Sequence, residues 1–316
     1  MDKIIAIAGP TAVGKTALSF YLADHYRTEL ISGDAYQIYK GMDIGTAKPT
    51  ADELSRFRHH LIDIAGPDEP YSAARFCDMA AKVARSLNER HKVPILVGGT
   101  GLYVQAFLEG FDFDGSAVTE DERERARKHI RTMTEGELRS YIEEQTRWQP
   151  PDWHELLANT HRLVRLMVAI DKGEGPAFVR AGHGHKVQYD AYVIGLSLPR
   201  EVLYDRIEKR VDMMLDAGWP EEVARLLHEG VSPQSQAMKA IGYEELALYV
   251  QGKISLADAA DEIKKRTRRF AKRQITWFKR MPYIHWYAKE DYASENELAA
   301  AVIRDTDNWL SDHPIV

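Results

Sequence analysis

The sequence predicts an α/β protein in which a parallel β-sheet is flanked by helices and carries a helical insertion. Two observations indicate this class: short apolar runs alternate with helical patterns, and a highly charged helical segment interrupts the alternation after about Gly115. Alternating strands and helices are typical of βαβ units, whose strands are parallel. Ligands of such sheets bind at the carboxyl ends of the strands.

The predicted strands are short and apolar. Residues 4–8 form a continuous, largely β-branched run, which is typical of a strand buried on both faces. Further strands are predicted at 29–32, 60–64, 94–97 and 192–196, and helices at 16–25 and 73–88.

The inserted segment is marked by two capping boxes, which open at Thr119 and Thr134. A third helix is predicted at 163–170, and a glycine-rich loop at 173–184 closes the segment. We therefore expect the following division: a discontinuous α/β core at 1–114 and 189–290, a helical insertion domain at 115–188 and a C-terminal helical tail at 291–316.

Composition excludes several classes of protein. The 316 residues carry 42 Lys and Arg against 48 Asp and Glu, so any nucleic-acid site must be a local patch. The one cysteine, Cys77, excludes an internal disulfide and a cysteine metal cluster, and we expect it to pack as a small residue. No apolar run reaches the roughly 20 residues that span a bilayer, and the first strand is no signal peptide. We expect a cytosolic protein without a membrane partner.

Residues 9–16 match the pattern G-x-x-x-x-G-K-[ST] and lie between a predicted strand and a predicted helix. Backbone N–H groups of such a P-loop surround phosphate oxygens, and the helix N-terminus adds partial positive charge. Lys15 is placed to neutralise outer phosphates, and the Thr16 hydroxyl to ligate Mg²⁺. The pattern predicts a P-loop NTPase-like sheet that binds a diphosphate or triphosphate, without indicating which.

Polar residues follow two other predicted strands. Asp34 comes after the strand at 29–32 and is predicted to face the same crevice as a general base or a magnesium ligand; the alternative is a carboxylate that caps a turn. Gly98 and Gly99 follow the strand at 94–97, where glycine allows close backbone approach to a ligand. Thr100 could then offer its hydroxyl and its N–H to a phosphate oxygen.

A basic segment at 264–280 contains no acidic residue. One face of the predicted helix, which begins just before this segment, is expected to pack on the core. This stripe consists of Ile263, Thr267, Phe270, Gln274 and Trp277. Cations occupy most of the remaining circumference. A solvated face is the alternative, but the acidic balance elsewhere favours contact with a nucleic-acid backbone.

Four segments together resemble the tRNA dimethylallyltransferases, also called tRNA isopentenyltransferases. They are residues 9–16, Asp34 with residues 37–49, residues 98–103 and residues 271–277. The likeness covers about residues 3–287, and the run at 37–49 is the most diagnostic because ordinary P-loop kinases lack it. Where the family usually has serine after the aspartate, this chain has Ala35, and an insert motif of the family is present in weaker form at 158–165.

The resemblance implies transfer of a dimethylallyl group from dimethylallyl diphosphate to N6 of adenine 37, beside the tRNA anticodon, which gives N6-isopentenyladenosine. Asp34 would be the base, Thr100 would assist the leaving diphosphate, and the P-loop would hold the donor rather than ATP. The diphosphate would be bound by Thr11, Ala12, Val13, Gly14, Lys15, Thr16, Arg206 and Arg210, with Mg²⁺ on Thr16. The tRNA would be bound by Asp34, Ala35, Tyr36, Gln37, Thr100, Arg123 (or Arg125, one slip away), Arg162, Arg165, Arg269, Lys272 and Arg273.

The partners implied are therefore the anticodon stem-loop of tRNA and dimethylallyl diphosphate, and we expect a monomer. One alternative is a small-molecule P-loop kinase, in which ATP fills the loop and Asp34 activates a hydroxyl. Such a kinase would use arginines of a small lid and would lack a long basic C-terminal helix. Another alternative is an RNA-binding module gated by a nucleotide, which the presence of both Asp34 and Thr100 disfavours.

Overall fold

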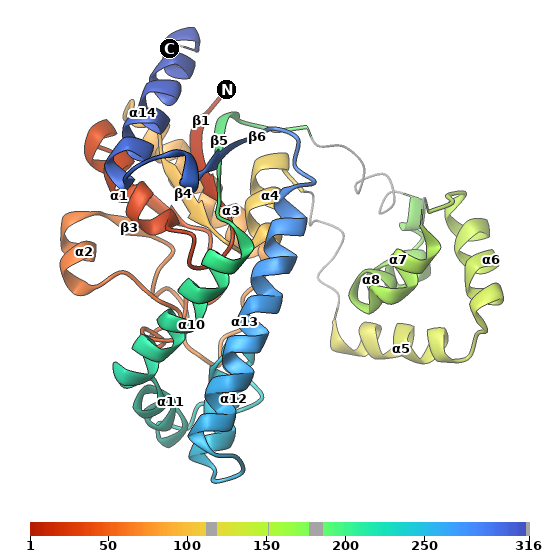
Figure 1. The fold of residues 1–316 in the computed structure, drawn as a ribbon. Coiled ribbons are helices and arrows are strands. Elements are labelled where there is room, and N and C mark those ends of the chain that lie inside the picture. The colour runs from red at the N-terminus through yellow and green to blue at the C-terminus, as the bar shows by residue number, and fades with distance from the viewer. Residues whose placement is uncertain (112–118, 151, 177–185, 314–316) are drawn as a thin grey trace. The chain divides into compact units, whose positions relative to one another are not determined.

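The computed structural model describes residues 1–111, 119–150, 152–176 and 186–313 (Figure 1). The chain forms two compact units, Met1–Gly110 with Val187–Val316 and Phe111–Lys186. Most of the glycine-rich loop predicted at 173–184 lies outside the described residues.

The first unit contains a sheet of six described strands in the order β3-β2-β4-β1-β5-β6, and all neighbours are parallel. The strands are β1 (Lys3–Ala8), β2 (Leu30–Ser32), β3 (His59–His60), β4 (Ile95–Gly98), β5 (Asp190–Ser197) and β6 (Ile284–Ala288). The predicted fold class is thus confirmed. The strand predicted at 60–64 is wrong in extent, because Leu61 and Asp63 adopt positive φ angles of 63° and 54°, which lie outside the β region.

Strand β1 lies in the middle of the sheet and is buried on both faces. Ile4 and its alternate neighbours join one apolar cluster, which includes Phe76 and Tyr103. Ile5 and Ile7 join the cluster on the other face, which includes Leu22. This two-sided burial is the reason why the run at 4–8 is continuously apolar.

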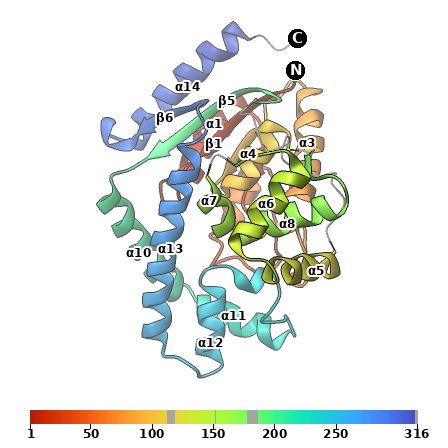
Figure 2. The same ribbon diagram turned by 90° about the vertical axis from the view of Figure 1, so that its right-hand side faces the viewer.

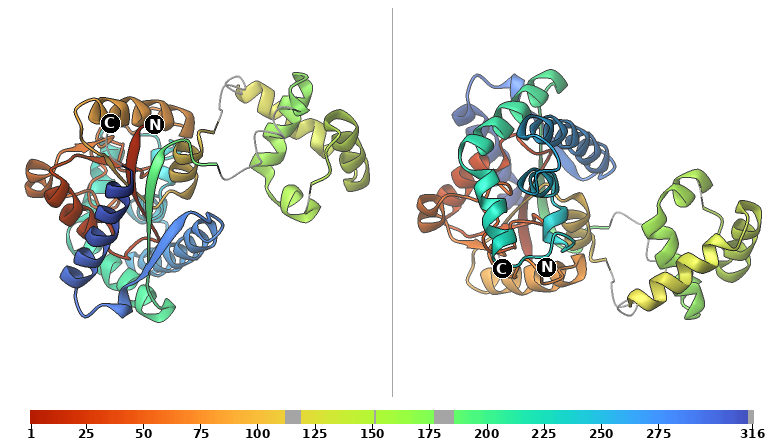
Figure 3. Two further views of the ribbon diagram at one scale, coloured as in Figure 1. Left: turned by 90° about the horizontal axis from the view of Figure 1, so that it is seen from above. Right: turned by 90° about the horizontal axis from the view of Figure 1, so that it is seen from below.

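The helices of the first unit cover both faces of this sheet (Figure 2). They are α1 (Lys15–Tyr26), α2 (Ala51–Arg56), α3 (Ala73–Asn88), α4 (Gly101–Glu109), α10 (Arg200–Asp216), α11 (Trp219–His228), α12 (Tyr243–Val250), α13 (Leu256–Phe278) and α14 (Glu295–Asp312), with the short 3₁₀ turns η1 (Ala237–Lys239) and η2 (Lys289–Asp291). Helix α14 packs against α1 (Figure 3), where the Tyr26 hydroxyl donates to Asp307 at 2.9 Å. Within the described ranges, no helix combines the length and apolar character that a bilayer crossing requires.

The basic segment lies on α13, which runs beside α10 and α12. The buried positions of this helix are Ala259, Ile263, Ala271, Gln274 and Phe278. The predicted stripe is wrong at its end: Phe278 is buried, whereas Trp277 is 39% exposed. Trp277 lies instead against the start of α4, where a Cβ on Gly101 would come within 2.6 Å of its ring.

The second unit is a small helical domain of α5 (Glu120–Arg131), α6 (Glu135–Thr146), α7 (Trp153–Ala158) and α8 (Thr160–Asp171). Both predicted capping boxes are confirmed, with Thr119 and Thr134 as the N-caps. Its separate apolar core includes Leu138, Ile142 and Met167.

Candidate active site

A cavity of about 600 Å³ opens at the carboxyl ends of β1, β2 and β4, a size typical of small-molecule sites. Its walls come from the P-loop, the segments after β2 and β4, and helices α10 and α13. Many of the predicted site residues line it, namely Thr11, Ala12, Gly14, Lys15, Thr16, Asp34, Tyr36, Gln37, Arg210 and Arg273. Segments distant in sequence therefore converge on one site of the first unit.

The P-loop has a backbone suited to binding an anion. Gly9 and Gly14 have φ angles of 143° and 107°, and a Cβ on Gly9 would lie 2.8 Å from the Leu196 carbonyl oxygen. Helix α1 begins at Lys15 without a side-chain cap, so the first-turn N–H groups remain for a ligand. Val13 is fully buried beneath the loop, which leaves only its backbone for contact with phosphate.

The Lys15 ammonium lies inside the loop. Its Nζ donates to the carbonyl oxygens of Gly9 and Pro10 at 2.9 and 2.8 Å. Burial lowers the pKa of Lys15 to about 7; the charge of Arg210 acts in the same direction, and that of Asp34 opposes it. A bound diphosphate would restore the charge of this group, because an opposite charge favours the protonated form.

Asp34 caps a turn and lines the cavity at the same time. Its Oδ1 accepts hydrogen bonds from the backbone N–H groups of Tyr36 at 2.8 Å and Gln37 at 3.3 Å. Burial raises the pKa of Asp34, while these hydrogen bonds and the charges of Lys15 and Arg210 oppose the rise. The turn-capping alternative is therefore observed, and it leaves the carboxylate beside the P-loop.

Thr100 joins the turns after β2 and β4. Its hydroxyl oxygen accepts a hydrogen bond from the Ala35 N–H at 3.1 Å, and a Cβ on Gly98 would meet the Gly33 carbonyl oxygen at 2.6 Å. Neither Thr100 nor Ala35 is among the residues that line the cavity. Thr100 is thus placed to orient the segment that carries Asp34.

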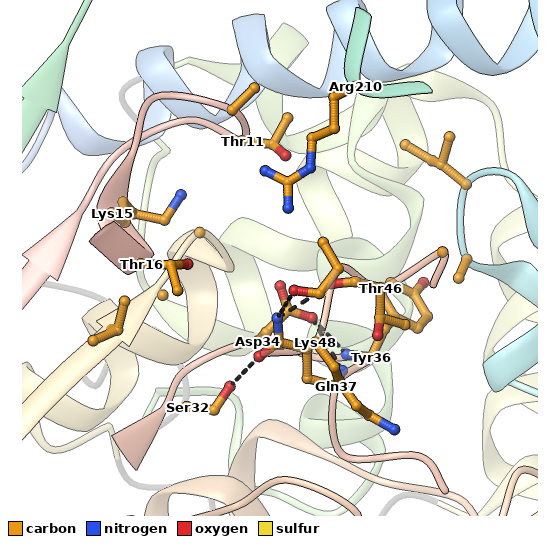
Figure 4. A pocket seen from close by; sticks show the side chains of 18 of the residues that line it. Thr11, Lys15, Thr16, Ser32, Asp34, Tyr36, Gln37, Thr46, Lys48 and Arg210 are labelled. Atoms are coloured by element: carbon orange, nitrogen blue, oxygen red, sulfur yellow. Dashed lines mark hydrogen bonds between the residues drawn. The ribbon is translucent and has the colours of Figure 1, made fainter. Parts of the chain in front are cut away.

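The two predicted diphosphate arginines are placed differently. Arg210 points its guanidinium into the cavity between the P-loop and Asp34 (Figure 4). Burial lowers the pKa of Arg210, and the charge of Asp34 opposes this shift. Arg206, one helical turn earlier, is exposed and does not line the cavity.

The Gln37 side chain makes hydrogen bonds through both the oxygen and the nitrogen of its amide. Its Oε1 accepts from the Ser32 hydroxyl at 2.9 Å, and its Nε2 donates to the carbonyl oxygens of Thr46 and Ala47, both at 3.2 Å. These partners determine which end of the amide is oxygen and which is nitrogen.

Two residues that were not predicted as site residues also contribute to the site. Gln274 on α13 accepts from the Thr11 N–H and donates to the Gly99 carbonyl oxygen. Arg266, which lines the cavity, pairs with Glu244 at 2.6 Å and with the buried Glu245. The available signal for Gln274 was its place on the predicted core-facing stripe of the basic segment. No signal in the sequence distinguished Arg266 from its basic neighbours.

The cations of α13 divide into two groups. Lys264 pairs with Asp212 at 2.5 Å, Lys265 with Glu262 at 2.8 Å, and Arg268 with Glu208. Arg269, Lys272 and Arg273 are exposed and make no ion pair with any described residue, and Arg273 also borders the cavity. These three are the cations predicted to bind tRNA.

The other arginines predicted to bind tRNA lie on the second unit. Arg123 pairs with Glu120 at 3.0 Å. Burial lowers the pKa of Arg165, and the positive charge of Arg123 acts in the same direction. Arg162 lies in the first turn of α8 and is exposed. Arg125 on α5 is exposed as well.

The Thr16 hydroxyl, the predicted Mg²⁺ ligand, lines the cavity, as do the carboxylates of Asp34 and Glu53. Over the described residues, no three His, Cys, Asp or Glu side chains gather to hold a metal. A single hydroxyl ligand fits Mg²⁺, which usually keeps several waters and binds substrate phosphates together with one or two protein groups.

Comparisons with known proteins agree with this geometry. The family model for IPP transferase matches residues 37–281. The tRNA dimethylallyltransferase of Macrococcus caseolyticus is 40% identical over 98% of this chain and 100% of that protein; that of Limosilactobacillus reuteri is 42% identical over 91% of this chain and 93% of its own length.

Solved structures show the same likeness. A tRNA isopentenylpyrophosphate transferase of Bacillus halodurans matches with a TM-score of 0.75 and 36% identity, covering 99% of this chain and 98% of that one. A eukaryotic dimethylallyltransferase acting on tRNA shares the fold, with a TM-score of 0.77 and 24% identity over 99% of this chain and 81% of that one.

Proposed function

We infer the function from the family: this chain belongs to the IPP transferases, the family of the tRNA dimethylallyltransferases. It is a prenyltransferase that transfers a dimethylallyl group to an adenine of tRNA. We propose N6 of adenine 37 as the acceptor. We propose dimethylallyl diphosphate as the donor. The observation that supports this assignment most strongly is the convergence of Lys15, Asp34 and Arg210 on one cavity of about 600 Å³.

The donor is expected to bind with its diphosphate on the P-loop. The N–H groups at the start of α1, the Lys15 ammonium and the Arg210 guanidinium then surround the oxygens that gain negative charge as the allylic C–O bond breaks. Donors placed in advance at such a position stabilise the transition state more than the ground state. Thr16 would hold Mg²⁺, which would supply further positive charge to the leaving group.

The acceptor is the N6 amine of adenine, a poor nucleophile because its lone pair is delocalised into the ring. As the new C–N bond forms and the C–O bond breaks, the amine must lose one proton. Asp34 is the carboxylate that lines the cavity beside the P-loop, and the raised pKa that burial gives it suits a proton acceptor. The electron pair of the broken bond leaves with the diphosphate.

The adenine must leave the stack of the anticodon loop to enter the cavity. Extrusion costs a few kcal/mol and is least costly in a single-stranded loop. Arg269, Lys272 and Arg273 are proposed to contact the tRNA backbone on the first unit, and Arg123, Arg162 and Arg165 on the second. We further propose that the protein acts as a monomer in the cytosol.

The direct test is incubation with unmodified tRNA and either dimethylallyl diphosphate or ATP, followed by digestion and nucleoside analysis. N6-isopentenyladenosine should form only with dimethylallyl diphosphate. Unchanged adenine with that donor, or phosphorylation of a small-molecule acceptor by ATP, would instead favour the kinase alternative.

A further inference from the structure

Glu222 on α11 carries a carboxylate that is buried together with four hydrogen-bond donors. The residue is 7% exposed. Its oxygens accept hydrogen bonds from the backbone N–H groups of Asp43 at 2.8 Å, Ile44 at 2.9 Å and Gly45 at 3.3 Å, and from the Tyr243 hydroxyl at 2.6 Å. A buried charge is costly unless it is satisfied in this way, so the geometry of the bound turn is closely determined.

The turn that Glu222 binds leads directly into the cavity wall. Gly45, Thr46 and Ala47 all line the cavity. The Ala47 N–H donates to the Ile44 carbonyl oxygen at 2.9 Å, so the residues that Glu222 binds and those that bind Gln37 form one continuous turn. The carbonyl oxygens of Thr46 and Ala47 accept both hydrogen bonds from the Gln37 amide.

Packing against α11 also restricts the position of this turn. The Trp219 ring, 2% exposed, lies one helical turn before Glu222. A Cβ on Gly45 or on Gly242 would lie within 2.1 or 1.9 Å of this ring. Trp219 therefore leaves room only for glycine at positions 45 and 242, and it prevents the turn from moving closer to α11.

We propose that Glu222 is a positioning residue for recognition of the adenine. By binding the 43–45 turn, it places the Thr46 and Ala47 carbonyl oxygens against the Gln37 amide nitrogen. The Ser32 hydroxyl occupies one lone pair of Gln37 Oε1, which leaves the second to accept an N–H such as the adenine amine. The inference rests on the proposed function, in which the extruded adenine enters the cavity that Gln37 lines.

The test compares Glu222→Gln with Glu221→Gln, a matched control at the adjacent, exposed position. The glutamine amide has the size of the carboxylate, but its NH₂ group cannot accept a hydrogen bond. Some of the four donors that surround Glu222 would therefore lose their acceptor. Loss of such buried hydrogen bonds should raise KM for an anticodon stem-loop about tenfold or more. Dimethylallyl diphosphate affinity should stay within about twofold of wild type, and the Glu221 variant should match wild type in both.

A double-mutant cycle with Gln37→Ala distinguishes action through Gln37 from a general effect on the fold. If Glu222 acts through Gln37, the double variant should have a KM little higher than that of either single variant. When Glu222→Gln is combined with Arg273→Ala, the two effects on KM should instead be additive. Assays run well below the measured unfolding midpoints. An additive cycle with Gln37, or an unchanged KM, would overturn the inference.

Tyr243→Phe provides the test if Glu222→Gln does not fold, since it removes one donor and leaves the three backbone hydrogen bonds. It should show a smaller rise in KM that is again non-additive with Gln37→Ala, and additivity there would also overturn the inference. If wild-type protein formed no modified nucleoside, the proposed function itself would fail. Wild-type transfer together with an additive cycle would refute only the role of Glu222.

Discussion

The Gln274 side chain accepts a hydrogen bond from the Thr11 backbone N–H, with 2.9 Å between oxygen and nitrogen. The same amide donates to the Gly99 carbonyl oxygen at 2.8 Å. One buried residue of the basic helix therefore joins the P-loop to the glycine turn after β4. The helix that carries the cations proposed to bind tRNA thus also forms part of the proposed donor site.

Gln274→Met should destabilise the protein, because it keeps much of the volume but leaves the Thr11 N–H and the Gly99 carbonyl unpaired. Each unpaired buried group costs about 1–3 kcal/mol, so we expect the free energy of unfolding to fall by about 2 kcal/mol or more. Urea denaturation without donor measures it. Lys279→Met, an exposed change at the end of the same helix, should lie within about 0.5 kcal/mol of wild type; equal stabilities of the two variants would contradict the bridging role.

Donor affinity should fall as pH rises above about 7. Lys15 has a pKa of about 7 in the free protein, and a bound diphosphate raises this pKa, so binding takes up a proton above pH 7. The affinity should decrease by at most about tenfold per pH unit until the pKa of the complex is reached. Calorimetric titration in buffers of different ionisation enthalpy measures the number of protons taken up on donor binding. Lys15→Met should bind weakly and lose this proton uptake, and the same uptake in the variant would assign it to another group.

The cavity should select dimethylallyl diphosphate over ATP. Ile207, Val211 and Met214 on α10 give the cavity an apolar surface suited to a prenyl chain, and residues of the 37–49 run line the same cavity. Calorimetric titration with each ligand tests the selection. Tight binding of ATP without binding of the allylic diphosphate would contradict it.

Replacing Arg269, Lys272 and Arg273 by Ala should weaken tRNA binding and flatten its salt dependence. Each lost phosphate contact lowers the slope of log K against log salt by about 0.7–0.9, so a decrease of about 2 to 3 is expected. The control is Lys264→Ala with Lys265→Ala, which removes cations already paired with Asp212 and Glu262. A full salt slope in the folded triple variant would identify these cations as a solvated surface.

The sequence predicted well those features that depend on neighbouring residues. The P-loop and the two capping boxes have short-range patterns, and strand β1 is recognisable because burial on both faces requires an apolar run. The third strand was predicted too long, because positive φ angles at Leu61 and Asp63 left no sign in the hydrophobic pattern.

Contacts between distant segments could not be predicted in the same way. Glu222 binds a turn 177 to 179 residues earlier, and the register of α11 against that turn exists only in the folded chain. Likewise, the family resemblance implied that Arg206 and Arg210 both bind the diphosphate. The orientation of α10 places only Arg210 in the cavity.

Asp34→Asn should raise the thermal unfolding midpoint at pH 7. Burial raises the pKa of Asp34 in the folded protein, so the ionised carboxylate is less favourable there than in the unfolded chain, and its charge lowers stability above the folded pKa. Asparagine can still accept from the Tyr36 and Gln37 N–H groups. The advantage of the variant should shrink as pH falls and Asp34 takes up a proton; a lower midpoint at pH 7 would show that the charge stabilises the fold.

The most direct test of the mechanism is the single-turnover rate of Asp34→Asn with bound dimethylallyl diphosphate and an anticodon stem-loop. General-base assistance is typically worth about 10²–10⁴-fold, so the rate should fall by roughly that factor while the dissociation constants of both substrates stay near wild type. The wild-type rate should rise with pH up to the pKa of Asp34, and the rate of the variant should not. A normal chemical step together with weakened donor binding would contradict the account, because Asp34 would then position the donor or its cation rather than accept the proton.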